Sequence, residues 1–299
     1  MIIALALSAS LDVTYEVDML HLGDITRPTA VTRVAGGKAL NVARAASALG
    51  AQVHAVAALG GATGRWVADM LSDDGVEATV VPLREITRTC IAIVEQTGAA
   101  TSTDVYEPAT PLGRAEWDAF AGATEAAVAD AVSRGSSPWV ALSGSIPRGV
   151  PLNELGALLD RVSETGARVV VDGSGEGLRA TAPAAQLVKV NRREASELLG
   201  VRLASAVDAC RALRERYRVD AVVTDGVAGS AALVGDVEAS APEPATFGRF
   251  PAGSGDAFLG GLLAAFDRGA SPLQALAAAS EAGERNAMVP GQGRLAPQA

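Results

Sequence analysis

A glycine-rich stretch near the end of the 299-residue chain has residue types that could bind an anion and accept a proton. Gly253-Ser254-Gly255-Asp256 precedes an apolar run over residues 257–266 that predicts a buried helix. Glycines let backbone N–H groups approach a ligand closely, and a helix N-terminus attracts negative charge. Asp256 can cap the helix, or it can accept a proton from a substrate hydroxyl. An ordinary capped loop has the same pattern, so the rest of the chain must distinguish the two interpretations.

Six other clusters of small and polar residues lie at or near the ends of predicted strands. Any one of them is explained by the tendency of such residues to end strands. Seven clusters in one chain indicate a long cleft at the carboxyl edge of a sheet, where ligands of α/β proteins bind. The six are Asp12, Gly36-Gly37-Lys38, Ser143-Gly144-Ser145, Asp172-Gly173-Ser174-Gly175, Lys189-Val190-Asn191 and Thr224-Asp225-Gly226.

The glycine pair at 36–37 opens a predicted helix. Lys38 and Asn41 lie in its first turn and would face a substrate held at the glycines, although a plain turn before an amphipathic helix is the alternative.

Two standard phosphate motifs are excluded. A Walker A motif needs Ser or Thr where Ala39 follows the lysine, and a dinucleotide fingerprint needs glycines where residues 8–10 are Ser-Ala-Ser.

The surrounding elements alternate between strand and helix, which predicts a mostly parallel sheet with crossover helices. The apolar run at residues 2–7 is expected to form a central strand covered on both faces, with Asp12 just past its carboxyl end. Further strands are predicted at 52–58, 78–81, 139–142, 168–171, 187–190 and 221–224, helices at 64–71, 114–132, 152–163, 192–199 and 205–217, and a hairpin at 231–239.

Two short, polar and β-branched segments interrupt this alternation. They cover residues 13–34 and the strand pair 88–95 and 101–106, and their similar character predicts one small accessory sheet outside the main one. The chain has no internal repeat, low-complexity block or linker. We therefore expect a single domain over residues 1–299, with lid strands drawn from about 13–34 and 87–106.

Composition excludes several classes of protein. The net charge is −9 and no basic tract is present, so neither nucleic acid nor an anionic membrane is an expected partner. No apolar run reaches the ~20 residues of a membrane helix, and the opening strand lacks the basic residues of a signal peptide. Cys90 and Cys210 are isolated, which favours a reducing, cytoplasmic location. His21 and His54 share no spacing typical of a zinc site.

These motifs together resemble the PfkB (ribokinase-like) carbohydrate kinases over nearly the whole chain. The family's two signatures match Gly36-Gly37-Lys38 and Gly253-Ser254-Gly255-Asp256. Within the family, the chain is most similar to the branch of 1-phosphofructokinase, tagatose-6-phosphate kinase and the minor 6-phosphofructokinase. The segments that indicate this branch are AGGKALNVARA from Ala35, TRTCIAI from Thr87, SGSIPRGVP from Ser143, DGSGEGL from Asp172 and KVNRREASELLG from Lys189.

The resemblance implies a ribokinase-like α/β fold, with a mostly parallel central sheet flanked by helices and a small β lid. It also implies ATP and Mg²⁺. Asp256 would act as the general base, and the backbone of Gly253, Ser254 and Gly255 would stabilise the transferred phosphoryl group. Glu194 would hold the metal, through water and together with Asn191; an ordinary first-turn carboxylate is the alternative.

The remaining site residues implied by the resemblance divide between sugar and nucleotide. Because the chain is acidic, a phosphorylated substrate needs a local basic pocket, and the candidates are Lys38 on the glycine turn and Arg27 and Arg88 on the two halves of the lid. The resemblance supports Arg88, in Thr87-Arg88-Thr89; for the two arginines, solvated lid charges are the alternative. The substrate set is Asp12, Gly36, Gly37, Lys38, Asn41, Arg88, Ser145 and Arg27. The nucleotide set is Lys189, Asn191, Thr224, Gly226, Gly229 and Asn286.

The expected reaction is transfer of the γ-phosphate of ATP to a phosphorylated ketohexose. Fructose 1-phosphate is the first choice, followed by tagatose 6-phosphate and fructose 6-phosphate. A kinase of an unphosphorylated sugar or nucleoside, and a non-catalytic sugar-phosphate sensor, are the alternatives. Ser8, Ala39 and Pro251 depart from the branch pattern and leave the identity of the sugar open. The resemblance also suggests a homodimer through the lid; regulation is not predicted.

Overall fold

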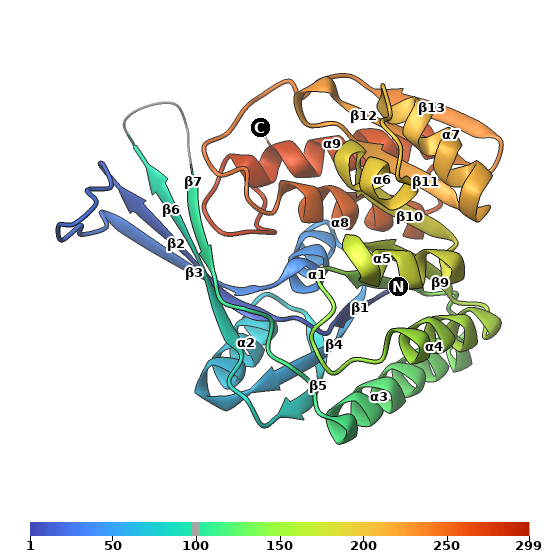
Figure 1. The fold of residues 1–299 in the computed structure, drawn as a ribbon, viewed down its shortest axis with the longest axis horizontal. Helices are drawn as coiled ribbons and strands as arrows, with labels where there is room; N and C mark the ends of the chain where they lie inside the picture. Colours follow the sequence, from blue (N-terminus) through green and yellow to red (C-terminus); the bar gives the residue numbers. More distant parts are fainter. Residues whose placement is uncertain (97–101, 299) are drawn as a thin grey trace.

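A nine-stranded sheet forms the centre of the computed structural model, which describes residues 1–96 and 102–298 (Figure 1). Seven strands are parallel: β1 (Ile2–Ala6), β4 (Val53–Gly60), β5 (Glu77–Leu83), β8 (Trp139–Ser143), β9 (Arg168–Asp172), β10 (Leu187–Asn191) and β11 (Asp220–Thr224). The hairpin strands β12 (Ser230–Val234) and β13 (Val237–Ala241) continue one edge in the antiparallel sense. The predicted fold class is confirmed.

Helices cover both faces of this sheet, which is why all five residues of β1 are buried and apolar. One face packs against α1 (Lys38–Ala48), α2 (Gly61–Asp73), α8 (Ser254–Asp267) and α9 (Pro272–Ala287). The other packs against α3 (Arg114–Ser133), α4 (Leu152–Glu164), α5 (Gly175–Thr181), α6 (Arg192–Leu199) and α7 (Ala206–Tyr217). Among the described residues, none of these helices is long and apolar enough to cross a membrane.

The strand order reverses beside β1. From the amino-terminal strand the chain moves to β4 and β5 on one side, and it later returns to β8 on the other side before adding the strands up to β13. A reversal of this kind opens a crevice at the carboxyl ends of the central strands, because the loops on either side turn away from each other. The polar clusters that follow β1, β8, β9, β10 and β11 therefore border one cleft.

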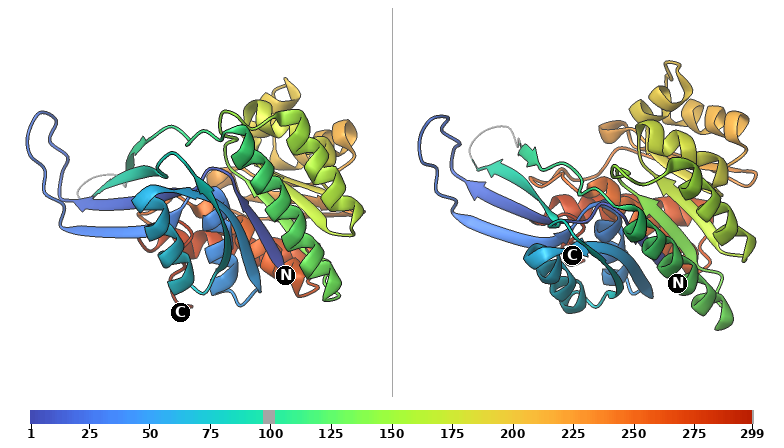
Figure 2. Two further views of the ribbon diagram at one scale, coloured as in Figure 1. Left: turned by 90° about the horizontal axis from the view of Figure 1, so that it is seen from below. Right: turned by 60° about the horizontal axis from the view of Figure 1, so that its bottom comes forward.

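A second, four-stranded sheet projects from one side of the molecule, as Figure 1 and Figure 2 show. Its strands are β2 (Ser10–Val17), β3 (Ala30–Gly36), β6 (Arg88–Glu95) and β7 (Ser102–Tyr106), in the order β3-β2-β6-β7. Thr101, predicted to begin the last lid strand, lies outside the described residues. The carboxyl end of β3 runs directly into α1, so the lid and the glycine turn at 36–37 are continuous.

Two local features were not predicted. Asp12 follows the first strand as expected, but it already lies within the lid strand β2, where it pairs with Val34 and Cys90. The reason is that β1 ends early, at Ala6, and a short turn leads at once into the lid. Residues 175–181 were not expected to be helical, yet they form α5 directly after the polar cluster that ends β9.

Candidate active site

A cavity of about 470 Å³ lies along the carboxyl edge of the sheet, under the lid. It brings together side chains from the lid, α1, the ends of β8 and β10, and the first turn of α8, which the chain separates by up to 240 residues or so. The predicted site residues that line it are Asp12, Gly37, Lys38, Asn41, Arg88, Ser145, Lys189, Asn191, Glu194, Thr224, Gly253, Gly255 and Asp256.

Asp256 lies in the first turn of α8 and is only 7% exposed. Its Oδ2 accepts a hydrogen bond from Asn41 Nδ2 at 2.9 Å. Burial raises the pKa of Asp256 to about 6, although the nearby Lys38 ammonium opposes this rise. A carboxyl group with such a pKa is ionised at neutral pH and still basic enough to accept a proton from a hydroxyl group.

The loop before α8 leaves specific backbone donors free. Gly253 has a φ of +85°, a conformation that favours glycine. The N–H of Ser254 donates to the carbonyl of Pro251 at 3.1 Å, and that of Asp256 donates to the carbonyl of Gly253 at 3.0 Å. Within the described part of the chain, the N–H groups of Gly253 and Gly255 have no such partner. These two donors, at a helix N-terminus, form a site for a negative group.

Asn286 holds this loop instead of contacting a nucleotide. Its side chain is fully buried in α9 and is not among the residues that line either cavity. Nδ2 donates to the carbonyl of Ala252 at 3.0 Å, and Oδ1 accepts from the N–H of Gly293 at 2.7 Å. The predicted nucleotide contact is therefore replaced by a structural role, because the helix turns this amide inward toward the loop.

The end of the cavity near the lid is built around Asp12. Its Oδ1 accepts from Ser10 Oγ at 2.5 Å, and its Oδ2 accepts from the N–H of Gly37 at 3.4 Å. Burial raises the pKa of this carboxyl group. Gly36 does not line the cavity, but a Cβ there would lie 2.0 Å from Asp12 Cγ, so only glycine leaves room for the carboxylate. This arrangement can fix sugar hydroxyl groups.

The two lid arginines differ in position. Arg88 lines the cavity; Nη1 donates to the carbonyl of Glu107 at 3.1 Å, and Nη2 donates to the carbonyl of Ser8 at 3.3 Å. Its Nε is buried without a hydrogen-bond partner among the described residues. Arg27 is exposed and lines neither cavity. It belongs to the connection between β2 and β3, which Figure 1 shows at the end of the lid far from the central sheet. Its predicted substrate contact is not made within this chain.

Ser145 does border the site, where its Oγ donates to Ser8 Oγ at 3.2 Å.

Two lysines approach one buried carboxylate between the sugar end and the α8 loop. Lys189 Nζ lies 3.1 Å from Asp172 Oδ2, and Lys38 Nζ lies 3.8 Å from Oδ1. Burial alone would raise the pKa of Asp172, but the two ammonium groups outweigh it and the pKa is lowered. The same carboxylate raises the pKa of Lys38. Sequence reasoning noted Asp172 in a polar cluster but gave it no role, since its partners are distant in the chain.

A second cavity of about 300 Å³ adjoins the first, and Thr224 and Gly255 line both. The predicted nucleotide residues Gly226 and Gly229 border it, as does Ser254. Its remaining walls were not predicted, because they come from apolar residues in irregular loops and from α8 and α9. They include Val227, Pro242, Pro244, Phe247 and Phe258. Such walls suit a flat, aromatic base.

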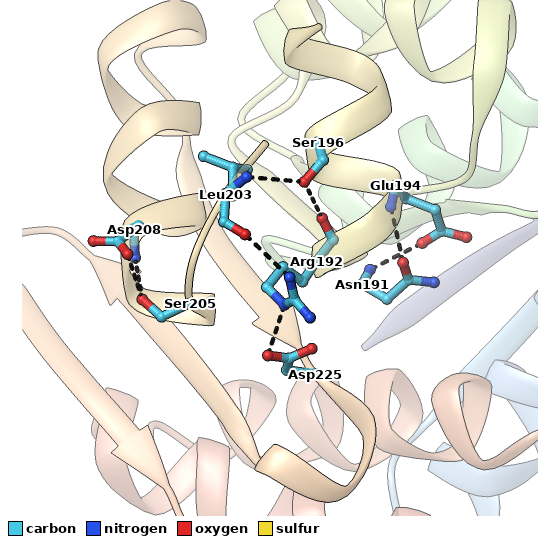
Figure 3. Close-up of polar contacts among 8 residues, drawn as sticks. All are labelled: Asn191, Arg192, Glu194, Ser196, Leu203, Ser205, Asp208 and Asp225. Atoms are coloured by element: carbon cyan, nitrogen blue, oxygen red, sulfur yellow. Dashed lines mark hydrogen bonds and ion pairs between the residues drawn. The ribbon is translucent and has the colours of Figure 1, made fainter. Parts of the chain in front are cut away.

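Asn191 and Glu194 form a capping box at the start of α6 (Figure 3). Asn191 Oδ1 accepts from the N–H of Glu194 at 2.8 Å, and Glu194 Oε2 accepts from the N–H of Asn191 at 2.9 Å. In residues 1–96 and 102–298, no three His, Cys, Asp or Glu side chains gather as a metal cage. One carboxylate beside an amide at the wall of the large cavity fits Mg²⁺, which proteins often hold through few side chains, water and substrate phosphates.

Figure 3 also shows a network between α6 and the loop after β11. Arg192 Nε donates to Asp225 Oδ2 at 2.7 Å, and its Nη1 donates to the carbonyl of Leu203 at 3.0 Å. Asp225 directly precedes the turn at 226–228 that borders the apolar cavity. The ion pair therefore joins the capping box of α6 to the wall of the apolar cavity.

Comparison with known proteins agrees with this geometry. The model of the pfkB family carbohydrate kinases matches residues 6–298. Phosphofructokinase-2 from Escherichia coli is 26% identical, with a TM-score of 0.87 over 99% of this chain and 95% of that one. A possible 1-phosphofructokinase from Thermotoga maritima, 20% identical, shares the fold with a TM-score of 0.80 over 95% and 92% of the two chains. The chain belongs to the PfkB family of carbohydrate kinases and is thus a phosphotransferase.

Proposed function

We propose that this kinase transfers the γ-phosphate of ATP to a hydroxyl group of a phosphorylated ketohexose, with Asp256 as general base. Fructose 1-phosphate remains the first candidate, followed by tagatose 6-phosphate and fructose 6-phosphate. Phosphofructokinase-2 from E. coli was solved with fructose-6-phosphate, so that sugar belongs in the first round of assays. A plain sugar or nucleoside kinase is the alternative to exclude.

The observation that favours a phosphosugar is the position of Arg88. Its guanidinium lies at the lid end of the cavity; among the described residues its buried Nε has no hydrogen-bond partner, and its two other nitrogens donate to backbone carbonyls. Arginine can grip a phosphate through parallel hydrogen bonds. The net charge of −9 means that a doubly charged substrate needs such a local cation, because the overall field repels it.

The chemistry follows from the arrangement of the two cavities. ATP would place its base in the apolar cavity and its γ-phosphate at the α8 loop, where Gly255 borders both cavities. The sugar would lie against Asp12 and Asn41, with one hydroxyl group directed at Asp256.

In the reaction, the hydroxyl oxygen attacks the γ-phosphorus while its proton passes to a carboxylate oxygen of Asp256. The bond from that phosphorus to the β–γ bridging oxygen breaks, and ADP leaves with the electron pair. The N–H groups of Gly253 and Gly255 would stabilise the transferred group. Asn191 and Glu194 would hold Mg²⁺, which neutralises charge on the β- and γ-phosphates.

A coupled ADP-release screen over sugars and sugar phosphates with Mg²⁺ tests the proposal. We expect a phosphoketohexose to be used far better than its unphosphorylated parent. Arg88→Ala should raise KM for that substrate about tenfold to a hundredfold, with little change in KM for ATP. Arg88→Lys should recover part of the loss, and Arg65→Ala, which removes an exposed arginine on α2, is the charge control. Equal use of free fructose and its phosphate, unaffected by Arg88→Ala, would overturn the phosphosugar assignment.

The proposal extends to a homodimer paired through the lid and to a cytoplasmic location. Val31, Val105 and Tyr106 expose apolar surface on lid strands, which is typical of a surface that another chain covers. A tetrameric inhibited form is known for phosphofructokinase-2 from E. coli. Sedimentation of the protein should therefore show at least a dimer, and Val105→Asp should shift it toward monomer.

The free cysteines, Cys90 and Cys210, are consistent with a reducing compartment.

A further inference from the structure

The carboxylate of Asp172 is buried behind the active site and incompletely paired. Its side chain is 1% exposed, and Oδ2 accepts a hydrogen bond from Ser143 Oγ at 3.4 Å in addition to its contact with Lys189. Oδ1 has no hydrogen-bond partner among the described residues, and Lys38 Nζ is 3.8 Å away. A buried charge is costly unless it is paired, so this oxygen depends on the lysine across the cleft.

Adjacent strands explain why the carboxylate sits there. Ser143 and Asp172 are register partners at the ends of β8 and β9. Lys189 lies on the neighbouring β10, and Lys38 reaches over from the first turn of α1. Both lysines line the large cavity, whereas Asp172 does not. Asp172 therefore does not border a ligand in this cavity, and it acts there by holding the two lysines and by its charge.

Both ammonium groups lie near the first turn of α8, since the charges of Lys38 and Lys189 both act on Asp256. A Cβ on Gly255 would lie 3.3 Å from Lys189 Nζ, so this lysine abuts the free N–H donors of the loop. The side chain of Lys38 is 43% exposed, and its Cβ packs 3.4 Å from where a Cβ on Gly144 would lie. The three groups carry a net charge of +1, which leaves one positive charge for a ligand.

We propose that Asp172 is a positioning residue for phosphoryl transfer, which holds the ammonium groups of Lys38 and Lys189 beside the α8 loop, where the transferred phosphate would bind. The inference rests on the proposed roles of ATP and of Asp256. In the competing view, Asp172 only neutralises Lys189 in the interior and has no effect on the reaction beyond stability.

The electrostatic surroundings of Asp256 supply a signature that a purely structural role would not produce. The groups that act on it are Lys38 and Asn41 from α1, Asp172 from β9 and Lys189 from β10. Burial is the largest influence on the pKa of Asp256, while Lys38 lowers this pKa and Asp172 raises it. Removing the charge of Asp172 should therefore move the acid limb of activity to lower pH. Removing the charge of Lys38 should move the limb to higher pH.

The test is a double-mutant cycle read through pH profiles. Asp172→Asn should lower kcat about tenfold to a hundredfold and shift the acid limb of kcat/KM downward. Lys38→Met, which changes a half-exposed side chain, should shift that limb upward. In the Lys38→Met background, Asp172→Asn should lower kcat less than it does in the wild type, because one of the two ammonium groups that Asp172 positions is already absent. Asp69→Asn makes the same change at an exposed carboxylate on α2, away from the cavity, and should leave both kcat and the acid limb unchanged.

Fully additive effects, or a fall in Tm with an unmoved acid limb, would show that Asp172 is only structural. If Asp172→Asn does not fold, the direction of the Lys38→Met shift decides: an unmoved or lowered limb overturns the inference. The role of Asp256 as general base is tested separately. If Asp256→Asn retains turnover, that role is refuted, whatever the variants of Asp172 and Lys38 show.

Discussion

Replacing Asp256 by Asn should abolish turnover and, at the same time, stabilise the protein. Asn preserves the shape of the side chain and can still accept the hydrogen bond from Asn41 Nδ2, but it cannot take a proton from the substrate. Loss of a general base typically costs ~10²–10⁴-fold in rate. In the wild type, a pKa of about 6 leaves roughly one-tenth of Asp256 ionised near pH 5, so kcat/KM should fall about tenfold from its neutral value.

The gain in stability follows from the same pKa. In the folded protein the pKa of Asp256 is about 6, above its ordinary value of 3.8, so the folded state binds the proton more tightly than the unfolded state. The stabilisation of the folded state by the proton on Asp256 is fully present below about pH 4 and is lost as the pH rises through about 6. The difference amounts to at most about 3 kcal/mol at neutral pH. Asp256→Asn escapes this loss, and its Tm near pH 7.5 should be roughly 5 °C higher.

Coupled ADP release from about pH 5 to 9 and thermal denaturation near pH 7.5 and pH 4 measure both effects. The advantage of Asp256→Asn in Tm should shrink toward zero at the lower pH. Retention of a tenth or more of kcat would refute the role of the base. A variant that is inactive and also less stable than the wild type at neutral pH would refute the reasoning about burial.

Three further perturbations test the nucleotide half of the site. Glu194→Gln should raise the Mg²⁺ concentration for half-maximal activity, and an unchanged metal titration would return Glu194 to a capping role alone. Gly253→Ala should lower kcat about tenfold or more, since a Cβ would lie 2.7 Å from a neighbouring side chain. Gly269→Ala is its control, having a similar φ of +80° with nothing within 4 Å. Arg192→Ala and Asp225→Ala should each raise KM for ATP about twofold to fivefold without changing KM for the sugar, and equal effects on both substrates would argue against a local role.

The alternation of apolar runs and small polar clusters was enough to predict the central sheet and most residues of its carboxyl edge. This works because parallel strands buried on both faces need continuous apolar runs, and because the loops at one edge necessarily converge. Lys38 and Asn41 lie in one helix and Asp256 lies 215 residues after Asn41, yet all three line one cavity.

What the sequence could not show depends on contacts between distant residues or on loop geometry. The partners of Asp172 lie on α1, β8 and β10, and no spacing along the chain indicates them. The apolar wall at Val227 and Phe247 lies in segments without periodicity. The inward orientation of Asn286 depends on how α9 packs against the α8 loop. The distance of Arg27 from the cavity depends on how far β2 and β3 extend before they are connected.

The continuity of β3 with α1 has a consequence for how such an enzyme can diversify. Asp12 and Arg88 lie on lid strands, and the glycine turn joins that lid to the helix bearing Asn41. The apolar cavity, which we propose to hold the base of ATP, is built from the opposite edge of the sheet and from α8 and α9. After gene duplication, lid substitutions can therefore explore new sugars while ATP use is inherited intact, so we expect paralogues of this chain to diverge fastest in residues 10–36 and 88–106.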